Sequence, residues 1–148
     1  GYRSQVDWPG ARYWRELAAH YPRAKVVLTV RPEADWYESV RQTIYVFMTE
    51  ARSHRSPQLR GLAEMAYETI VQQVFGGRLD DREHAIAVFR RHIVDVQNAI
   101  PSDRLLTFSV SEGWAPLCRF LGVPIPSEKF PRTNPRNEFP KPRSASPG

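Results

Sequence analysis

The sequence predicts an α/β fold that is rich in helix and contains two parallel strands. Residues 24–30, AKVVLTV, form an apolar run without alternation, which is typical of a strand buried on both faces of a parallel sheet. A second run of this kind, LLTFSV, occupies residues 105–110. Helical patterns separate the two runs, and parallel neighbours need such crossovers. We therefore expect both strands in one sheet, with residues 24–30 as a central strand.

A first helix is expected at about residues 10–21, because Pro22 ends a helical pattern of apolar residues. Asp7, Trp8 and Pro9 lead into it. Asp7 has two open interpretations. It is either the N-cap of this helix, a common role for Asp, or a chemically active carboxylate near the rim of the sheet.

The stretch after the first strand reads as a turn followed by a second helix. Arg31 comes directly after the strand, and Pro32 and an acidic first turn then open a helix that we expect to run to about Ser53. Ligands of open α/β sheets bind beyond the carboxyl ends of the strands. Ser39 stands eight residues after Arg31. An Arg and a Ser placed in this way can hold a phosphate, although both residues also fit an ordinary protein surface.

Three more helices are predicted further along the chain. The first covers about residues 58–75 and stops at Gly76-Gly77. Asp81 can cap the next, at residues 82–99, and the last opens at Ser111 or Glu112 and closes at Gly122. Beyond Val123 the chain is rich in proline, so we expect an extended wrap and then a disordered tail at residues 140–148.

The composition fits one domain of 148 residues with a real core and a net charge of +5. This charge suits a phosphorylated ligand without requiring nucleic acid. The single Cys118 excludes a disulfide framework and favours a cytoplasmic location. No apolar run reaches the roughly 18 residues of a membrane span. The four histidines are expected on helix surfaces, and their spacing does not favour a metal site.

Several segments taken together resemble the cytosolic-type sulfotransferase family, particularly its microbial and fungal branch. They are VDWP, ELAAHYPRAKVVLTVR, WYES, GWAPLCRFLGVPIP and FPRTN. The resemblance covers nearly the whole chain and implies a partial P-loop-like three-layer fold, with residues 1–139 as the C-terminal portion of the domain. The family's Gly-rich phosphosulfate loop has no counterpart here. That loop and a first strand are expected upstream of Gly1, a start that favours a processed, engineered or truncated chain.

The resemblance also implies a function and roles for particular residues. It implies transfer of a sulfuryl group from 3′-phosphoadenosine 5′-phosphosulfate (PAPS) to a hydroxyl or amine of a small-molecule acceptor, without a metal. Arg31 and Ser39 match the pair that holds the 3′-phosphate, Asp7 stands where the family has a general base, and Arg132 is a weaker candidate for the cofactor site. The alternatives are a non-catalytic helical interaction module and a phosphoryl-transfer enzyme of related fold.

Overall fold

The computed structural model describes residues 3–131, which divide into two compact units. The first unit is built from the chain up to Pro32 and from Phe89 to Pro131, and the second from Glu33 to Val88. Helix α5, Arg82–Ala99, begins in the second unit and ends in the first. Among the described helices, none combines the length and the apolar character needed to cross a bilayer.

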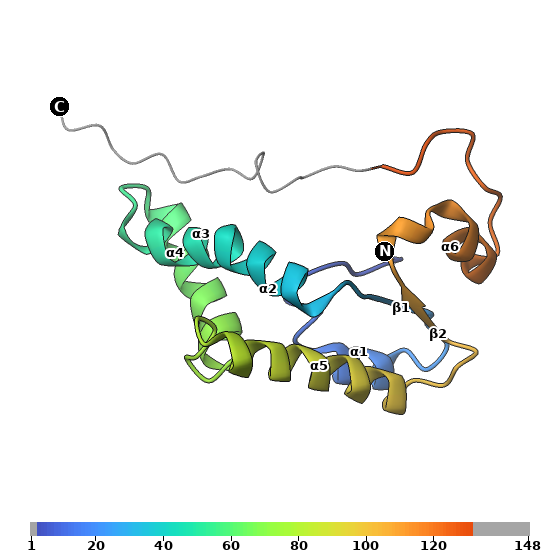
Figure 1. The fold of residues 1–148 in the computed structure, drawn as a ribbon, viewed down its shortest axis with the longest axis horizontal. Coiled ribbons are helices and arrows are strands. Elements are labelled where there is room, and N and C mark those ends of the chain that lie inside the picture. The colour runs from blue at the N-terminus through green and yellow to red at the C-terminus, as the bar shows by residue number, and fades with distance from the viewer. Residues whose placement is uncertain (1–2, 132–148) are drawn as a thin grey trace. The chain divides into compact units, whose positions relative to one another are not determined.

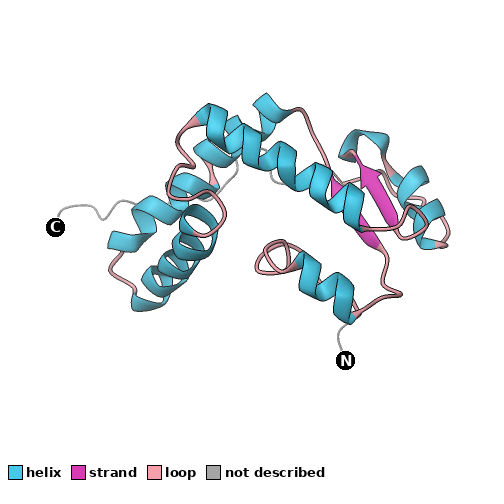
Figure 2. Ribbon diagram, turned by 90° about the horizontal axis from the view of Figure 1, so that it is seen from below, coloured by secondary structure: helices cyan, strands magenta, loops and turns pink. Residues whose placement is uncertain are grey.

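A two-stranded parallel sheet lies at the centre of the first unit (Figures 1 and 2). Strand β1, Val26–Thr29, pairs with β2, Leu105–Phe108, so that Val26 is opposite Leu105 and Thr29 is opposite Phe108. One further backbone hydrogen bond extends the pairing, from Val30 N–H to the Phe108 carbonyl at 2.8 Å. The α/β class and the parallel pairing of the two predicted strands are therefore confirmed.

The two faces of this sheet are covered unequally. On one face Leu28 packs with Val96 of α5 and with Ile100, the residue that follows this helix. This core is extended by half-buried side chains, namely Trp14, Ala18, Val26, Val30, Ile93 and Leu105. On the other face Phe108 is buried, but Val27 is 37% exposed and Thr29 is also exposed. The prediction that β1 is buried on both faces is wrong for the described chain. Apolar composition shows that a strand can be buried, whereas burial itself depends on the elements that cover it.

The helices of the first unit are α1, Trp14–His20, and α6, Trp114–Leu121. Helix α1 starts later than predicted because turns occupy the residues before it. Gly122 ends α6 in the left-handed conformation, with φ 74°. The predicted extended wrap follows: the Trp114 indole N–H donates to the Glu128 carbonyl at 2.9 Å, and Phe130 packs edge-on against Trp114. The predicted tail at residues 140–148 lies outside the described residues.

In the second unit, the helix predicted to run from Pro32 to about Ser53 is broken into three pieces. They are α2 at Glu33–Gln42, α3 at Ile44–Glu50 and the 3₁₀ turn η1 at Ala51–Ser53. The break falls at Thr43, whose φ and ψ are −121° and −82°. The buried Thr43 hydroxyl donates to the Ser39 carbonyl at 2.6 Å. Such side-chain bonds to the backbone compete with regular helical geometry.

The helix predicted at about residues 58–75 also changes its geometry partway. It consists of α4, Pro57–Ala66, and the π-helical turn η2, Tyr67–Gln72. The Thr69 hydroxyl donates to the Met65 carbonyl at 2.8 Å, close to the point where the geometry changes. Gly76 and Gly77 follow with φ of 58° and 76°, so the predicted glycine stop is confirmed.

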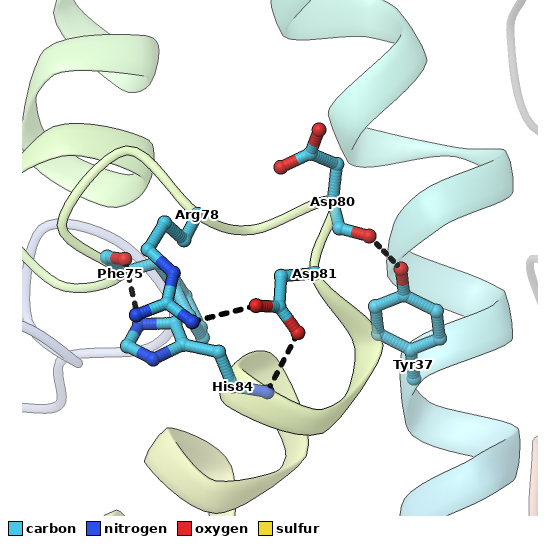
Figure 3. A network of polar contacts seen from close by, with 6 residues as sticks. All are labelled: Tyr37, Phe75, Arg78, Asp80, Asp81 and His84. Carbon is cyan, nitrogen blue, oxygen red and sulfur yellow. Dashed lines mark hydrogen bonds and ion pairs between the residues drawn. The ribbon is translucent and has the colours of Figure 1, made fainter.

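The start of α5 agrees with the prediction and is held by a polar network (Figure 3). The Asp81 carboxylate accepts the His84 N–H at 3.1 Å, which is the bond of a helix N-cap. The same carboxylate pairs with Arg78 at 2.6 Å. The Tyr37 hydroxyl donates to the Asp80 carbonyl at 2.6 Å and joins α2 to this network.

The second unit has its own apolar core. Its buried side chains come from every helical segment of the unit and are Tyr37, Met48, Ala51, Ala63, Ile70, Val71, Phe75, Leu79 and Ala85.

We predict that Leu28→Ala destabilises the first unit by about 2 to 5 kcal/mol, because it leaves a cavity against α5. The neighbouring Val27→Ala is the matched control and should cost about 1 kcal/mol or less, since Val27 faces outward. Denaturant unfolding followed by circular dichroism measures both. Equal losses for the two variants would contradict the assignment of the buried face.

We also predict an acid-dependent contribution from Asp81. The Arg78 guanidinium and, secondarily, the His84 N–H hold the pKa of Asp81 below its usual 3.8. A carboxyl whose folded pKa is depressed stabilises the protein above pH 3.8, and this stability is lost as the pH falls through the folded pKa. The stability difference between the parent and Asp81→Asn should therefore shrink in acid. Asp80→Asn is the control, and a difference that stays constant with pH would refute the assignment.

Candidate anion-binding edge and acid–base residue

Arg31 lies at the carboxyl edge of the sheet, two residues after the end of β1. Its side chain is exposed, and within residues 3–131 it forms no salt bridge. An Arg after a strand is often a surface residue paired with a nearby carboxylate, and this pairing is not observed. The guanidinium therefore keeps its donors available for an anion.

The Ser109 turn, residues 109–112, lies at the same edge because it follows β2 directly. It contains the short 3₁₀ segment η3, Val110–Glu112. The Ser109 N–H donates to a Glu112 carboxylate oxygen at 2.7 Å, and the hydroxyls of Ser109 and Ser111 are 2.8 Å apart. These hydroxyls were not among the predicted site residues. The pattern Ser-x-x-Glu at residues 109–112 is typical of a capping box, and it is the sequence feature that could have indicated this turn.

Ser39 lies in α2, where it is half-buried. Its carbonyl accepts the Thr43 hydroxyl at 2.6 Å, and Glu33 and Asp35 occupy the first turn of the helix. Acidic side chains there already complement the helix dipole, so an anion would have to rely on side-chain donors. Arg31 belongs to the first unit and Ser39 to the second. Their pairing as a phosphate clamp stays a prediction, and Arg132 lies outside the described residues.

Asp7 lies in the turn that leads into α1. It is exposed and has a φ of 61°, in the left-handed region that Asp and Asn tolerate better than most residues. One carboxylate oxygen accepts the Trp8 N–H at 2.8 Å, and the Asp7 carbonyl accepts the Ala11 N–H at 3.1 Å. The interpretation of Asp7 as the helix N-cap is wrong, because α1 begins only at Trp14 and its N-cap residue is Tyr13.

The environment of the Asp7 carboxylate is compatible with proton transfer. Its second carboxylate oxygen makes no hydrogen bond within the described chain, and the side chain is open to solvent. No hydrogen bond or ion pair joins Asp7 to Arg31 among residues 3–131. The structure thus places the two residues in one unit but does not bring them into contact.

Three histidines contradict the prediction that all four lie on helix surfaces. His54, His84 and His92 are half-buried. His54 accepts the Ser56 N–H through Nδ1 at 3.0 Å, and His84 contacts the Phe75 carbonyl through Nε2 at 2.9 Å. In the part of the chain that the structure describes, no three His, Cys, Asp or Glu side chains form a group able to hold a metal ion.

Comparisons with known proteins identify the family of the chain. The family model described as "Sulfotransferase domain" matches residues 1–139. The chain is similar to "Ava biosynthesis cluster protein M" of Aspergillus versicolor, with 32% identity over 142 residues that cover 88% of this chain and 53% of the relative. It therefore spans about half the length of this curated relative. The family-model match, which covers most of the chain, shows that the chain belongs to the sulfotransferase family.

Proposed function

We propose that this chain contributes the nucleotide clamp and the general base of an enzyme that transfers the sulfuryl group of PAPS to a small-molecule hydroxyl or amine. The observation that carries the proposal is the exposed Arg31, which has no carboxylate partner in the described chain and stands beyond the carboxyl end of β1. Membership of the sulfotransferase family supports this reading of the guanidinium. The P-loop-like architecture is part of the same proposal.

In this proposal the 3′-phosphate binds to Arg31 and Ser39. A guanidinium offers a planar pair of donors to a phosphate, and a serine hydroxyl adds a third bond. The hydroxyls of Ser109 and Ser111 lie at the same edge of the sheet as Arg31 and can donate to the nucleotide from the β2 side.

Asp7 acts on the acceptor in this proposal. Its carboxylate takes the proton as the acceptor oxygen or nitrogen forms a bond to sulfur, and the bond between sulfur and the bridging phosphate oxygen breaks in line. The leaving group is adenosine 3′,5′-bisphosphate. Cations must neutralise the charge that develops on the sulfuryl group and the leaving phosphate. The sequence contains no G-x-x-x-x-G-K-[ST] loop, so we assign that task to residues that correspond to the rest of the relative.

The cellular setting belongs to the same proposal. The buried, unpaired Cys118 is compatible with a reducing environment, and we therefore place the protein in the cytoplasm.

We predict that Arg31→Ala weakens binding of adenosine 3′,5′-bisphosphate by roughly 1.5 to 3 kcal/mol, the range for hydrogen bonds to charged groups. Calorimetry should use a polypeptide that also includes the residues corresponding to the rest of the relative. Arg31→Lys should fall between the parent and Arg31→Ala, because lysine keeps the charge but loses the planar fork.

Arg23→Ala is the matched control for this measurement. Arg23 is also exposed but precedes β1, so it lies at the opposite end of the strand, and its replacement should leave the affinity near that of the parent. Unchanged affinity in Arg31→Ala would rule out the clamp. Absence of nucleotide binding by the parent would instead favour the interaction module.

We predict that Asp7→Asn lowers turnover by about 10²- to 10⁴-fold, the usual cost of losing a general base. Asparagine tolerates the left-handed φ and keeps an oxygen for the Trp8 N–H, so the variant should fold and bind the nucleotide like the parent. Glu16→Gln removes another carboxylate of the first unit, in α1, and serves as the charge control. Parental turnover in Asp7→Asn would make Asp7 a structural residue.

A further inference from the structure

Helix α1 is held in place by very few interactions. It has seven residues and buries none of them completely. A helix of this length is unstable by itself and depends on tertiary contacts. Trp14 and Ala18 supply such contacts by packing against the core formed by Leu28, Val96 and Ile100.

A second set of contacts joins α1 to α5 through four side chains, which we call the α1 latch: Trp14, Arg15, His92 and Asp95. The His92 ring meets the Trp14 ring edge-on, with 6.1 Å between the centroids and 82° between the planes. Arg15 lies over the Trp14 ring at 4.3 Å and pairs with Asp95 at 3.0 Å. Each α1 residue of the latch therefore contacts an α5 residue of the latch.

The half-buried position of His92 favours its neutral form. Its pKa is lowered from 6.5 chiefly by burial; the Asp95 carboxylate raises it, and the Arg15 guanidinium lowers it to a smaller extent. Protonation would place a positive charge in a half-buried position, and the attraction of Asp95 does not outweigh the cost of burying that charge. A cation–π contact with Trp14 offers limited relief, because Arg15 already lies over that ring.

Helix α1 is connected to the Asp7 turn by a continuous series of backbone hydrogen bonds. The Ala11 N–H donates to the Asp7 carbonyl at 3.1 Å, the Tyr13 N–H to the Pro9 carbonyl at 3.3 Å, and the Leu17 N–H to the Tyr13 carbonyl at 3.0 Å. A change in how α1 docks is therefore passed to the turn that holds the Asp7 carboxylate.

We propose that the neutral His92 ring holds α1, and with it the Asp7 turn, against α5, and that protonation of this ring on acidification loosens the docking. His92 is thus a positioning residue, and its bearing on catalysis rests on the proposed function. A histidine whose folded pKa is depressed favours the docked state above its ordinary value of 6.5, and this advantage declines as the pH falls below that value.

Amide hydrogen exchange with residue resolution tests the docking without any activity assay. Between neutral and mildly acidic pH, protection factors at residues 14–20 should fall several-fold relative to those in the β1–β2 pair.

Two variants remove the titratable ring. The side chains introduced by His92→Gln and His92→Phe cannot be protonated, and phenylalanine also keeps an aromatic edge for Trp14. In both variants, the ratio of the protection factors at residues 14–20 to those in the β1–β2 pair should therefore be independent of pH. His20→Gln, on the exposed side of α1, is the control and should behave like the parent. A pH-independent ratio in the parent, or the parental pH dependence in both His92 variants, overturns the proposal.

Replacing each member of the Arg15–Asp95 ion pair gives a second test, because the two replacements should shift the titration midpoint of His92 in opposite directions. NMR titration of the His92 ring should show a higher midpoint in Arg15→Met, which loses a cation, and a lower midpoint in Asp95→Asn, which loses an anion. A purely structural role of the ion pair predicts no such opposite shifts, and midpoints that move in the same direction would refute the electrostatic coupling. Because these measurements involve neither nucleotide nor acceptor, a failure of the latch is distinguishable from a failure of the proposed function.

Discussion

The parallel pairing of β1 with β2 is the constraint on which the candidate site depends. The pairing places Thr29 opposite Phe108, so Arg31 and the Ser109 turn leave the sheet at the same edge. The same register decides which side chains meet α5, since successive residues of a strand face opposite sides. A shift of one residue would turn Leu28 away from Val96 and Ile100. Burial of the core and placement of the anion-binding edge are therefore fixed together, by the same backbone hydrogen bonds.

Elements with strong local signals could be predicted from the sequence, and elements that depend on side-chain competition could not. The bounds of α5 agree with the prediction because Asp81 caps it and Pro101 follows it. The break at Thr43 escaped prediction because apolar periodicity does not register a hydroxyl that bonds to a carbonyl one turn earlier. The exposure of Val27 was not predicted for another reason: the sequence shows which residues can be buried, but not which elements cover them.

The candidate site shows the same division. The place of Arg31 follows from a strand, a proline and a helix in succession, and these are local signals. The lack of an ion pair between Arg31 and a carboxylate of the described chain depends on tertiary structure and could not be predicted from the sequence. Asp7 was ambiguous because Asp is common both at helix N-caps and among chemically active residues, and the left-handed backbone of Asp7 could not be predicted from the sequence. The contact of His92 with Trp14 joins helices far apart in sequence, and no spacing rule predicts it.

These differences bear on how the proposed chemistry is supported. Arg31 follows a strand whose pairing and core are stabilised by backbone bonds and by Leu28, whereas Asp7 precedes a short helix without a fully buried residue. Local opening needs little free energy where few apolar contacts must be broken, so α1 should open more readily than the sheet. In the proposed enzyme, nucleotide binding is therefore tied to a stable element and proton transfer to a marginal one. Perturbations of α1 then act on turnover before they act on nucleotide affinity, which gives the α1 latch its functional consequence.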